Sequence, residues 1–248
     1  MKIAVCISHV PDTAAKINIG NDGKNIDPSG VTYVVNPYDE YAIEEALKTK
    51  EKSGGETVAI SLGGDANKET LRKALAMGID EAVLLKDGGD RDSIAVSKAL
   101  ADEIKAQSAV LVFFGKQSVD FDNSIVGQLT AEQLGYNSVS VAVSFSLEGD
   151  KIRCEREIEG GKEVVETSLP AVITAQKGLN EPRYASLKGI MAAKKKVIIE
   201  KQPEQAGNTV EIISVKKPAM KKAGKILGTD ATAVPELIRL LRDEAKVI

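Results

Sequence analysis

The sequence predicts an α/β protein built on a doubly wound, mainly parallel sheet, and three observations point to this class. Up to about residue 135, short apolar runs rich in β-branched residues alternate with longer stretches of helical period. The 248 residues are 43% apolar and 28% charged, which suits a globular chain with a sizeable core. Beyond that point, alternating runs separated by glycine turns predict an antiparallel extension of the sheet.

Each element of the first half has a local signal. Continuous apolar runs predict buried strands at Lys2–Ile7, Thr57–Leu62, Ala82–Leu85 and Ala109–Phe114. Apolar residues at helical spacing predict helices at Tyr38–Lys52, Lys68–Met77, Ser93–Gln107 and Asn123–Leu134. Gly78 and Gly135 end two of these helices, and Asn123 or Ser124 is expected to cap the last one.

The second half predicts strands at Ser138–Leu147, Lys151–Glu157, Glu163–Thr167 and Ala171–Thr174. Because no linker-like stretch precedes them, we assign residues 1–200 to one domain. From Lys201 onward prolines, glycines and lysines punctuate the chain, which ends in a predicted helix at Thr232–Ala245. This segment has few core-like residues, so residues 201–248 are expected to form a C-terminal arm that packs on a partner subunit.

Composition excludes several classes of function. The net charge of −3 provides no global basic field for a nucleic acid. One histidine and two distant cysteines make a metal site or a catalytic triad improbable. We see neither a transit peptide nor an apolar run long enough for membrane insertion. The expected location is cytoplasmic, or the mitochondrial matrix in a eukaryote.

Ligands of open parallel sheets bind at the carboxyl ends of the strands, where three loops qualify: His9–Ile17, Val35–Asp39 and Gly115–Asn123. The third joins a buried strand to a helix N-terminus, whose free N–H groups can cradle a nucleotide phosphate. Asp120 and Asp122 would repel a phosphate unless they bind ribose hydroxyls or cap the helix. An ordinary capped loop is the alternative interpretation.

The segment from Cys154 to Lys196 contains the runs REIEGG and NEPRY. Together with VNPYDEYAIEEAL at Val35–Leu47, ETLRKALAMGIDEA at Glu69–Ala82 and GKQSVDFDNSIVGQLTAEQLG at Gly115–Gly135, it closely resembles the beta subunit of electron transfer flavoprotein. The resemblance covers nearly the whole chain and is weakest in the tail. It implies a Rossmann-like, adenine-nucleotide-hydrolase-like fold.

The resemblance also implies a heterodimer in which this chain turns over no substrate of its own. A larger alpha subunit holds a redox-active FAD, and the beta subunit binds AMP in a structural role. The pair carries single electrons from flavin dehydrogenases, such as acyl-CoA dehydrogenases, to a membrane-bound quinone oxidoreductase.

Transferred residue by residue, the family's nucleotide contacts fall on loops that the fold argument also selects. Tyr38 matches an aromatic position near the flavin of the partner. The expected cofactor-binding residues are Cys6, Asn36, Pro37, Tyr38, Asp39, Leu62, Gly115, Lys116, Gln117, Ser118, Val119, Asp120, Phe121, Asp122, Asn123, Ser124, Ile125 and Val126.

The loop Gly178–Ser186 matches the segment that docks dehydrogenases, with Leu179 as an exposed anchor. Without the family context, a Leu packed on its own subunit is the commoner case. Glu157 matches a carboxylate that restrains the flavin domain. The expected partner-docking residues are Leu179, Asn180, Glu181, Pro182, Arg183, Tyr184, Glu157, Lys194, Lys195 and Lys196.

The chain departs from the family at His9, where a basic residue is usual. Two alternatives stay open. A bifurcating relative would hold a second FAD in place of AMP and accept electrons from NADH, although the run Asn180–Tyr184 favours the AMP-binding group. A nucleotide-binding protein of the universal-stress type would form a homodimer, but its glycine-rich phosphate motif is missing here.

Overall fold

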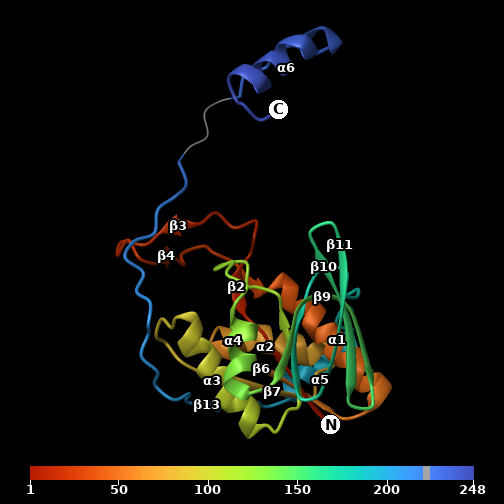
Figure 1. Cartoon of the computed structure of the whole chain (residues 1–248). Coiled ribbons are helices and arrows are strands. Elements are labelled where there is room, and N and C mark those ends of the chain that lie inside the picture. The colour runs from red at the N-terminus through yellow and green to blue at the C-terminus, as the bar shows by residue number, and fades with distance from the viewer. Residues whose placement is uncertain (220–223) are drawn as a thin grey trace.

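The computed structural model describes residues 1–219 and 224–248. Within these residues, nine strands form one sheet in the order β11-β10-β9-β12-β8-β1-β6-β7-β13 (Figure 1). These strands are β1 (Lys2–Cys6), β6 (Glu56–Gly63), β7 (Glu81–Lys86), β8 (Leu111–Gly115), β9 (Asn137–Glu148), β10 (Lys151–Ile158), β11 (Gly161–Ser168), β12 (Ala171–Ala175) and β13 (Ile198–Lys201).

The helices of the described residues cover both faces of the sheet or belong to the arm. They are α1 (Pro37–Ser53), α2 (Asn67–Met77), α3 (Ser93–Ala106), α4 (Val126–Leu134), α5 (Leu187–Lys195), the 3₁₀ turn η1 (Ala231–Ala233) and α6 (Val234–Asp243). Two small sheets pair β2 (His9–Pro11) with β5 (Tyr33–Val35), and β3 (Asn18–Ile19) with β4 (Ile26–Asp27).

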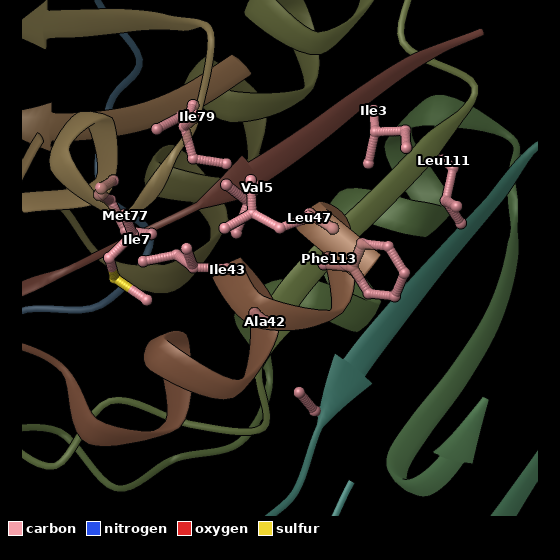
Figure 2. Close-up of a cluster of buried hydrophobic side chains, with 14 of the residues drawn as sticks. Ile3, Val5, Ile7, Ala42, Ile43, Leu47, Met77, Ile79, Leu111 and Phe113 are labelled. Carbon is pink, nitrogen blue, oxygen red and sulfur yellow. The ribbon is translucent and has the colours of Figure 1, made fainter. Parts of the chain in front are cut away.

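Successive side chains of β1 point to opposite faces of the sheet and so divide the core in two. Ile3 and Val5 join the cluster formed with α1, α2 and α5, part of which Figure 2 shows. Ala4 and Cys6 join the second cluster, formed with α3 and α4. A sheet covered on both faces explains why these strands are continuously apolar in sequence. The doubly wound α/β fold is therefore confirmed.

The antiparallel extension belongs to the same sheet, as predicted. Strand β9 runs parallel to β12, while β10 and β11 continue from it as an antiparallel meander. The expected position of these strands was right, and their bounds are slightly longer than predicted.

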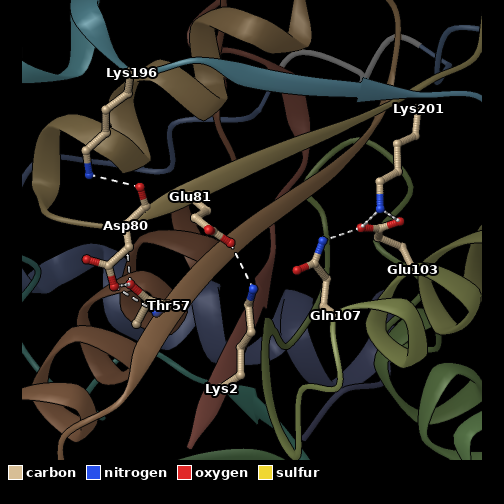
Figure 3. Close-up of polar contacts among 8 residues, drawn as sticks. All are labelled: Lys2, Thr57, Asp80, Glu81, Glu103, Gln107, Lys196 and Lys201. Atoms are coloured by element: carbon tan, nitrogen blue, oxygen red, sulfur yellow. Dashed lines mark hydrogen bonds and ion pairs between the residues drawn. The ribbon is translucent and has the colours of Figure 1, made fainter.

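Sequence reasoning missed several short elements. Strand β13 closes the sheet beside β7, where the sequence pattern predicted no strand. Lys201 of β13 pairs with the buried Glu103 of α3 at 2.9 Å (Figure 3). Such an edge strand has only four residues and a mixed polar sequence, so its pattern gives no period-2 signal.

Helix α5 was also missed, and its place is fixed by contacts with α2. The guanidinium of Arg72 donates to the carbonyls of Ala193 and Lys196 at the end of α5. Gly189 allows the close approach, because a Cβ there would lie 2.3 Å from the carbonyl oxygen of Ala76. Ser186 caps the helix by accepting from the N–H of Gly189 at 3.0 Å.

The C-terminal arm leaves the sheet after Lys201 and runs along the α3 side of the body toward the β3–β4 hairpin (Figure 1). Residues 220–223, which include two of the lysines of the arm, lie outside the described residues. The predicted final helix forms as η1 and α6, and no residue of α6 is buried. Among the described residues, no helix has the length and apolar character needed to span a membrane.

Candidate functional site

The carboxyl ends of β1 and β8 meet the amino end of α1 at one edge of the sheet. Asp39, in the first turn of α1, joins all three elements. Its Oδ2 accepts a hydrogen bond from the backbone N–H of Ser8 at 2.7 Å, and its Oδ1 accepts one from the N–H of Gly115 at 3.1 Å. One buried carboxylate therefore fixes the point where two strands and a helix converge.

Asn36, directly before α1, is fully buried and holds the loop that follows β8. Its Nδ2 donates to Oδ1 of Asp39 at 2.9 Å and to the carbonyl of Gln117 at 2.8 Å. Its Oδ1 accepts from the N–H of Val119 at 3.2 Å. The structure thus brings together the predicted segments Asn36–Asp39 and Gly115–Val119.

Gly115 is required by the closeness of α1. A Cβ at this position would lie 2.3 Å from Oδ1 of Asp39 and 2.7 Å from the Cβ of Tyr38, so a side chain would force the two elements apart. The next residue, Lys116, places its Nζ 4.9 Å from the centre of the Tyr38 ring, which is cation–π distance. The edge therefore carries a lysine ammonium held over an aromatic ring.

Burial raises the pKa of Asp39 to about 7, with a smaller contribution from the charge of Asp120. The hydrogen bonds from Ser8, Asn36 and Gly115 oppose this rise because they stabilise the carboxylate. Burial, and then the charge of Asp39, raise the pKa of the Cys6 thiol well above its ordinary value. Cys6 therefore stays protonated at neutral pH and serves as core packing.

The remainder of the loop folds back on itself through Gln117. The Gln117 side chain donates to Oδ1 of Asp122 and accepts from the Ser124 hydroxyl, the latter at 2.7 Å. Asp122 and Ser124 have positive φ angles of 54° and 51°, which bend the chain sharply. Asp120 and Phe121 lie exposed at the tip of the loop.

Helix α4 begins at Val126, so the prediction that Asn123 or Ser124 caps a helix starting there was wrong. The Asn123 amide instead donates to the hydroxyl of Ser93 at 2.9 Å, and Ser124 is bonded to Gln117. The residue at the cap position, Ile125, has no acceptor in its side chain. The first N–H groups of α4 consequently have no side-chain cap.

Beside this helix terminus, the buried Oε1 of Gln128 has no hydrogen-bond partner within the described residues. Uncapped N–H groups carry the positive end of the helix dipole and favour an anion. Leu62, at the end of β6, packs half-buried against the cluster that contains Cys6, and its carbonyl accepts from Asn67 at 3.1 Å. Leu62 and Cys6 therefore belong to the same apolar cluster.

His9 lies apart from this polar network. Its ring stacks on Tyr33 with centroids 4.9 Å apart, and its Nδ1 is 2.6 Å from the Thr70 hydroxyl. Burial lowers its pKa. The imidazole at the family's basic position is therefore held by neighbours within its own subunit.

The second candidate region, the loop Gly178–Ser186, lies against α1 farther along that helix. Arg183 forms a bidentate ion pair with the buried Glu44. Its Nε lies 2.8 Å from Oε2 and its Nη2 lies 2.9 Å from Oε1 of that carboxylate, and the guanidinium also pairs with Glu51. Asn180 donates to Glu45 and to the carbonyl of Tyr41, each at 2.9 Å. Two of the predicted docking residues thus hold the loop on its own subunit.

Leu179 is half-buried and packs against the main core cluster, so its side chain is less exposed than expected, and its role as the docking anchor stays a prediction. The exposed apolar side chains lie farther along: Tyr184 is 99% exposed, Leu187 83% and Met191 67%. Sequence reasoning missed Leu187 and Met191 because α5 itself was missed.

The three predicted lysines differ in surroundings. Lys194 and Lys195 are exposed at the end of α5. Lys196 is half-buried. Its Nζ donates to the carbonyl of Ile79 at 2.7 Å and to that of Asp80 at 3.0 Å, and Figure 3 shows the second of these bonds. Glu157 is exposed on β10. Sequence reasoning also missed Glu44, whose position beside the apolar residues Ala42, Ile43, Ala46 and Leu47 was the available signal.

The chain is similar to known proteins along its whole length. Residues 24–206 match the electron transfer flavoprotein domain family. The chain is 40% identical, over all of both chains, to the electron transfer flavoprotein subunit beta of Bacillus subtilis. It is also 38% and 37% identical to the subunits of that name from Mus musculus and Homo sapiens, over 96% of each chain. On this similarity, the chain belongs to the beta subunits of electron transfer flavoproteins.

Proposed function

We propose that this chain binds AMP in a structural role and pairs with an alpha subunit that holds FAD. In this proposal the heterodimer accepts electrons from flavin dehydrogenases, such as acyl-CoA dehydrogenases, and delivers them singly to a membrane-bound quinone oxidoreductase. The FAD, when bound, supplies the redox chemistry. The residues of this chain bind, orient and shield, and turn over no substrate themselves.

The observation that carries the nucleotide proposal is the uncapped N-terminus of α4 beside the polar edge. Its N–H groups without a side-chain cap suit a phosphate. The Oε1 of Gln128, which has no partner in the part of the chain that the structure describes, suits a donor such as an amino or hydroxyl group. Asn36 and Asp39 hold the loop at this edge in place before any ligand arrives. These N–H donors and this oxygen acceptor together fit a mononucleotide.

For docking, we propose the surface formed by Tyr184, Leu187 and Met191, with Leu179 supporting it from below. A small exposed apolar surface suits a transient encounter with a redox enzyme. The ammonium groups of Lys194 and Lys195 lie at the end of the same helix and add positive charge next to that surface. Glu157 remains the proposed contact with the flavin-bearing domain of the alpha subunit.

For the arm, we propose that α6 packs on the alpha subunit. Val234, Leu237, Ile238 and Leu241 recur at the spacing of one helix face, and none of them is buried. An apolar stripe of this kind is covered when a partner packs on it.

The test is co-expression with the alpha subunit, followed by quantification of AMP and FAD per heterodimer. We expect one of each, with the isolated beta chain colourless. Two FAD and no AMP would overturn the AMP assignment in favour of a bifurcating relative. Homodimers that bind ATP without a flavoprotein partner, or substrate turnover by the isolated chain, would overturn the proposal as a whole.

A further inference from the structure

The C-terminal arm is fixed to the body well before it reaches α6. After β13 it crosses the loop between β7 and α3, where residues 204–210 contact residues 90–92. It then reaches the β3–β4 hairpin, where the N–H of Val215 donates to the carbonyl of Gly23 at 2.8 Å. The first of these attachments has the denser set of hydrogen bonds.

Asp92 is at the centre of this attachment, and its two carboxylate oxygens have separate roles. Oδ1 caps α3 by accepting from the N–H of Ala95 at 2.8 Å. Oδ2 faces the arm and accepts from the N–H and the hydroxyl of Thr209 and from the N–H of Val210, the last at 3.0 Å. These hydrogen bonds lower the pKa of Asp92, which therefore stays ionised at neutral pH.

Asn208 completes the attachment from the side of the arm. Its Oδ1 accepts from the N–H of Asp92 at 2.9 Å, and its Nδ2 donates to the carbonyl of Asp90 at 2.9 Å. Arg91, itself paired with Asp87, donates to the carbonyl of Glu204 at 2.9 Å. Each of the two segments therefore donates hydrogen bonds to the other. We call this set, residues 90–92 with residues 208–210, the clasp.

We propose that Asp92 is a positioning residue that aligns the arm, through the clasp, before the alpha subunit binds. This inference rests on the proposed function of α6. A segment ordered in advance loses less conformational entropy on association than a free one, so a preset arm strengthens assembly. Every donor and acceptor of the clasp belongs to this chain.

The first test measures amide hydrogen exchange in the isolated full-length chain carrying Asp92→Asn. The new side chain keeps an oxygen that can cap α3, but its NH₂ group replaces the acceptor that three donors of the arm face. We expect exchange at Thr209 and Val210 to rise about tenfold or more, with α3 unchanged. Asp90→Asn is the matched control, because Asp90 contributes its backbone carbonyl to the clasp.

The second test measures assembly of the same variants with the FAD-loaded alpha subunit. For Asp92→Asn we expect an affinity about tenfold weaker, with an unchanged flavin spectrum in the heterodimer that forms. Equal hydrogen exchange at Thr209 in wild type and variant would show that Asp92 does not hold the arm through the clasp. Faster exchange with unaltered affinity would overturn the positioning role.

A third variant separates this inference from the proposal on which it rests. Leu237→Ser with Ile238→Ser changes α6 and leaves the clasp intact. If this double variant assembles as tightly as wild type, the proposed contact of α6 fails, whatever Asp92→Asn does. If it weakens assembly while Asp92→Asn does not, only the positioning role fails.

Discussion

The loop Gly178–Ser186 and the C-terminal arm are both proposed to face other proteins, yet they are built in opposite ways. The loop is held on α1 by an ion pair with a buried carboxylate and by the side chain of Asn180. The arm is fastened at its root, and its terminal helix α6 has no buried residue. The loop is proposed to meet a dehydrogenase briefly, and the arm is proposed to meet the alpha subunit permanently. The two ways of building these segments match these two lifetimes.

A dehydrogenase that docks briefly needs a surface already in its final shape, because ordering a loop at every encounter would weaken and slow the binding. A permanent subunit can be met by a segment that completes its packing on that partner. The free energy of unfolding of the isolated chain tests this contrast.

Raising the pH from 5 to 8 should lower the stability of the body, which includes the loop, and leave the attachment of the arm unchanged. The folded state raises the pKa of Asp39 to about 7, so it binds a proton more tightly than the unfolded chain, where the pKa is near 3.8. The free energy of unfolding therefore falls as pH rises through this range, by about 2–3 kcal/mol from this group.

Urea titrations at each pH measure this change, and Asp39→Asn is expected to flatten the slope. Hydrogen exchange at Thr209, corrected for the intrinsic pH dependence of exchange, should follow no such trend, because Asp92 is ionised throughout. A slope that persists in Asp39→Asn would assign the titration to another group.

Arg183→Met should destabilise the chain by about 2 kcal/mol, because it leaves the carboxylate of Glu44, only 6% exposed, without its cation. Glu51→Gln removes the outer half of the same network at a side chain that is 58% exposed, so a loss below about 0.5 kcal/mol is expected. Equal losses in the two variants, measured by urea unfolding, would mean that the loop is not held through Glu44.

Leu179→Ala and Leu187→Ala form a matched pair that separates packing from docking. Leu179 packs on the core, so its truncation should cost about 1–2 kcal/mol of stability. Leu187 is 83% exposed, so its truncation should change stability by less than about 0.5 kcal/mol.

Electron transfer from an acyl-CoA dehydrogenase to the heterodimer, measured by rapid mixing, should show the reverse order. We expect Leu187→Ala to raise the apparent KM for the flavoprotein while its FAD content stays unchanged. If Leu179→Ala impairs electron transfer more strongly than Leu187→Ala when the same fraction of each variant is folded, the docking anchor is Leu179, as the resemblance implied.

Leu237→Ser should have the smallest effect on the isolated chain, below about 0.5 kcal/mol, because this residue packs on no core cluster of the body. Its effect should appear in the heterodimer, whose thermal unfolding temperature is expected to fall. A loss of stability in the isolated chain would show that α6 already packs on its own body, and the contrast between loop and arm would not hold.

The sequence predicted the elements that have strong periodicity and missed those that depend on tertiary contacts. The continuous apolar run Ala109–Phe114 predicts its strand, and the apolar residues at helical spacing around Ile43 predict their helix. Strand β13 and helix α5 are short and mixed in polarity. They are held by side chains distant in sequence, such as Arg72 and Glu103, which no local pattern contains.

The candidate site shows the same division. The loops around Asn36 and Gly115 follow from the rule that ligands bind at the carboxyl ends of parallel strands. The start of α4 does not, because the good capping residues Asn123 and Ser124 are drawn into contacts with Ser93 and Gln117 instead. The inward packing of Leu179 likewise depends on how Arg183 and Asn180 fasten the loop, which a linear sequence does not reveal.

Strand β13 has a further consequence for how the subunit is made. The strand that closes the sheet is followed immediately by the arm, while its neighbour β7 was synthesised much earlier. On the ribosome, the edge beside β7 stays open until residues 198–201 emerge, and the segment that we propose to contact the partner emerges directly afterwards. The order of translation thus places the last strand of the sheet just before the segment proposed to join a second chain.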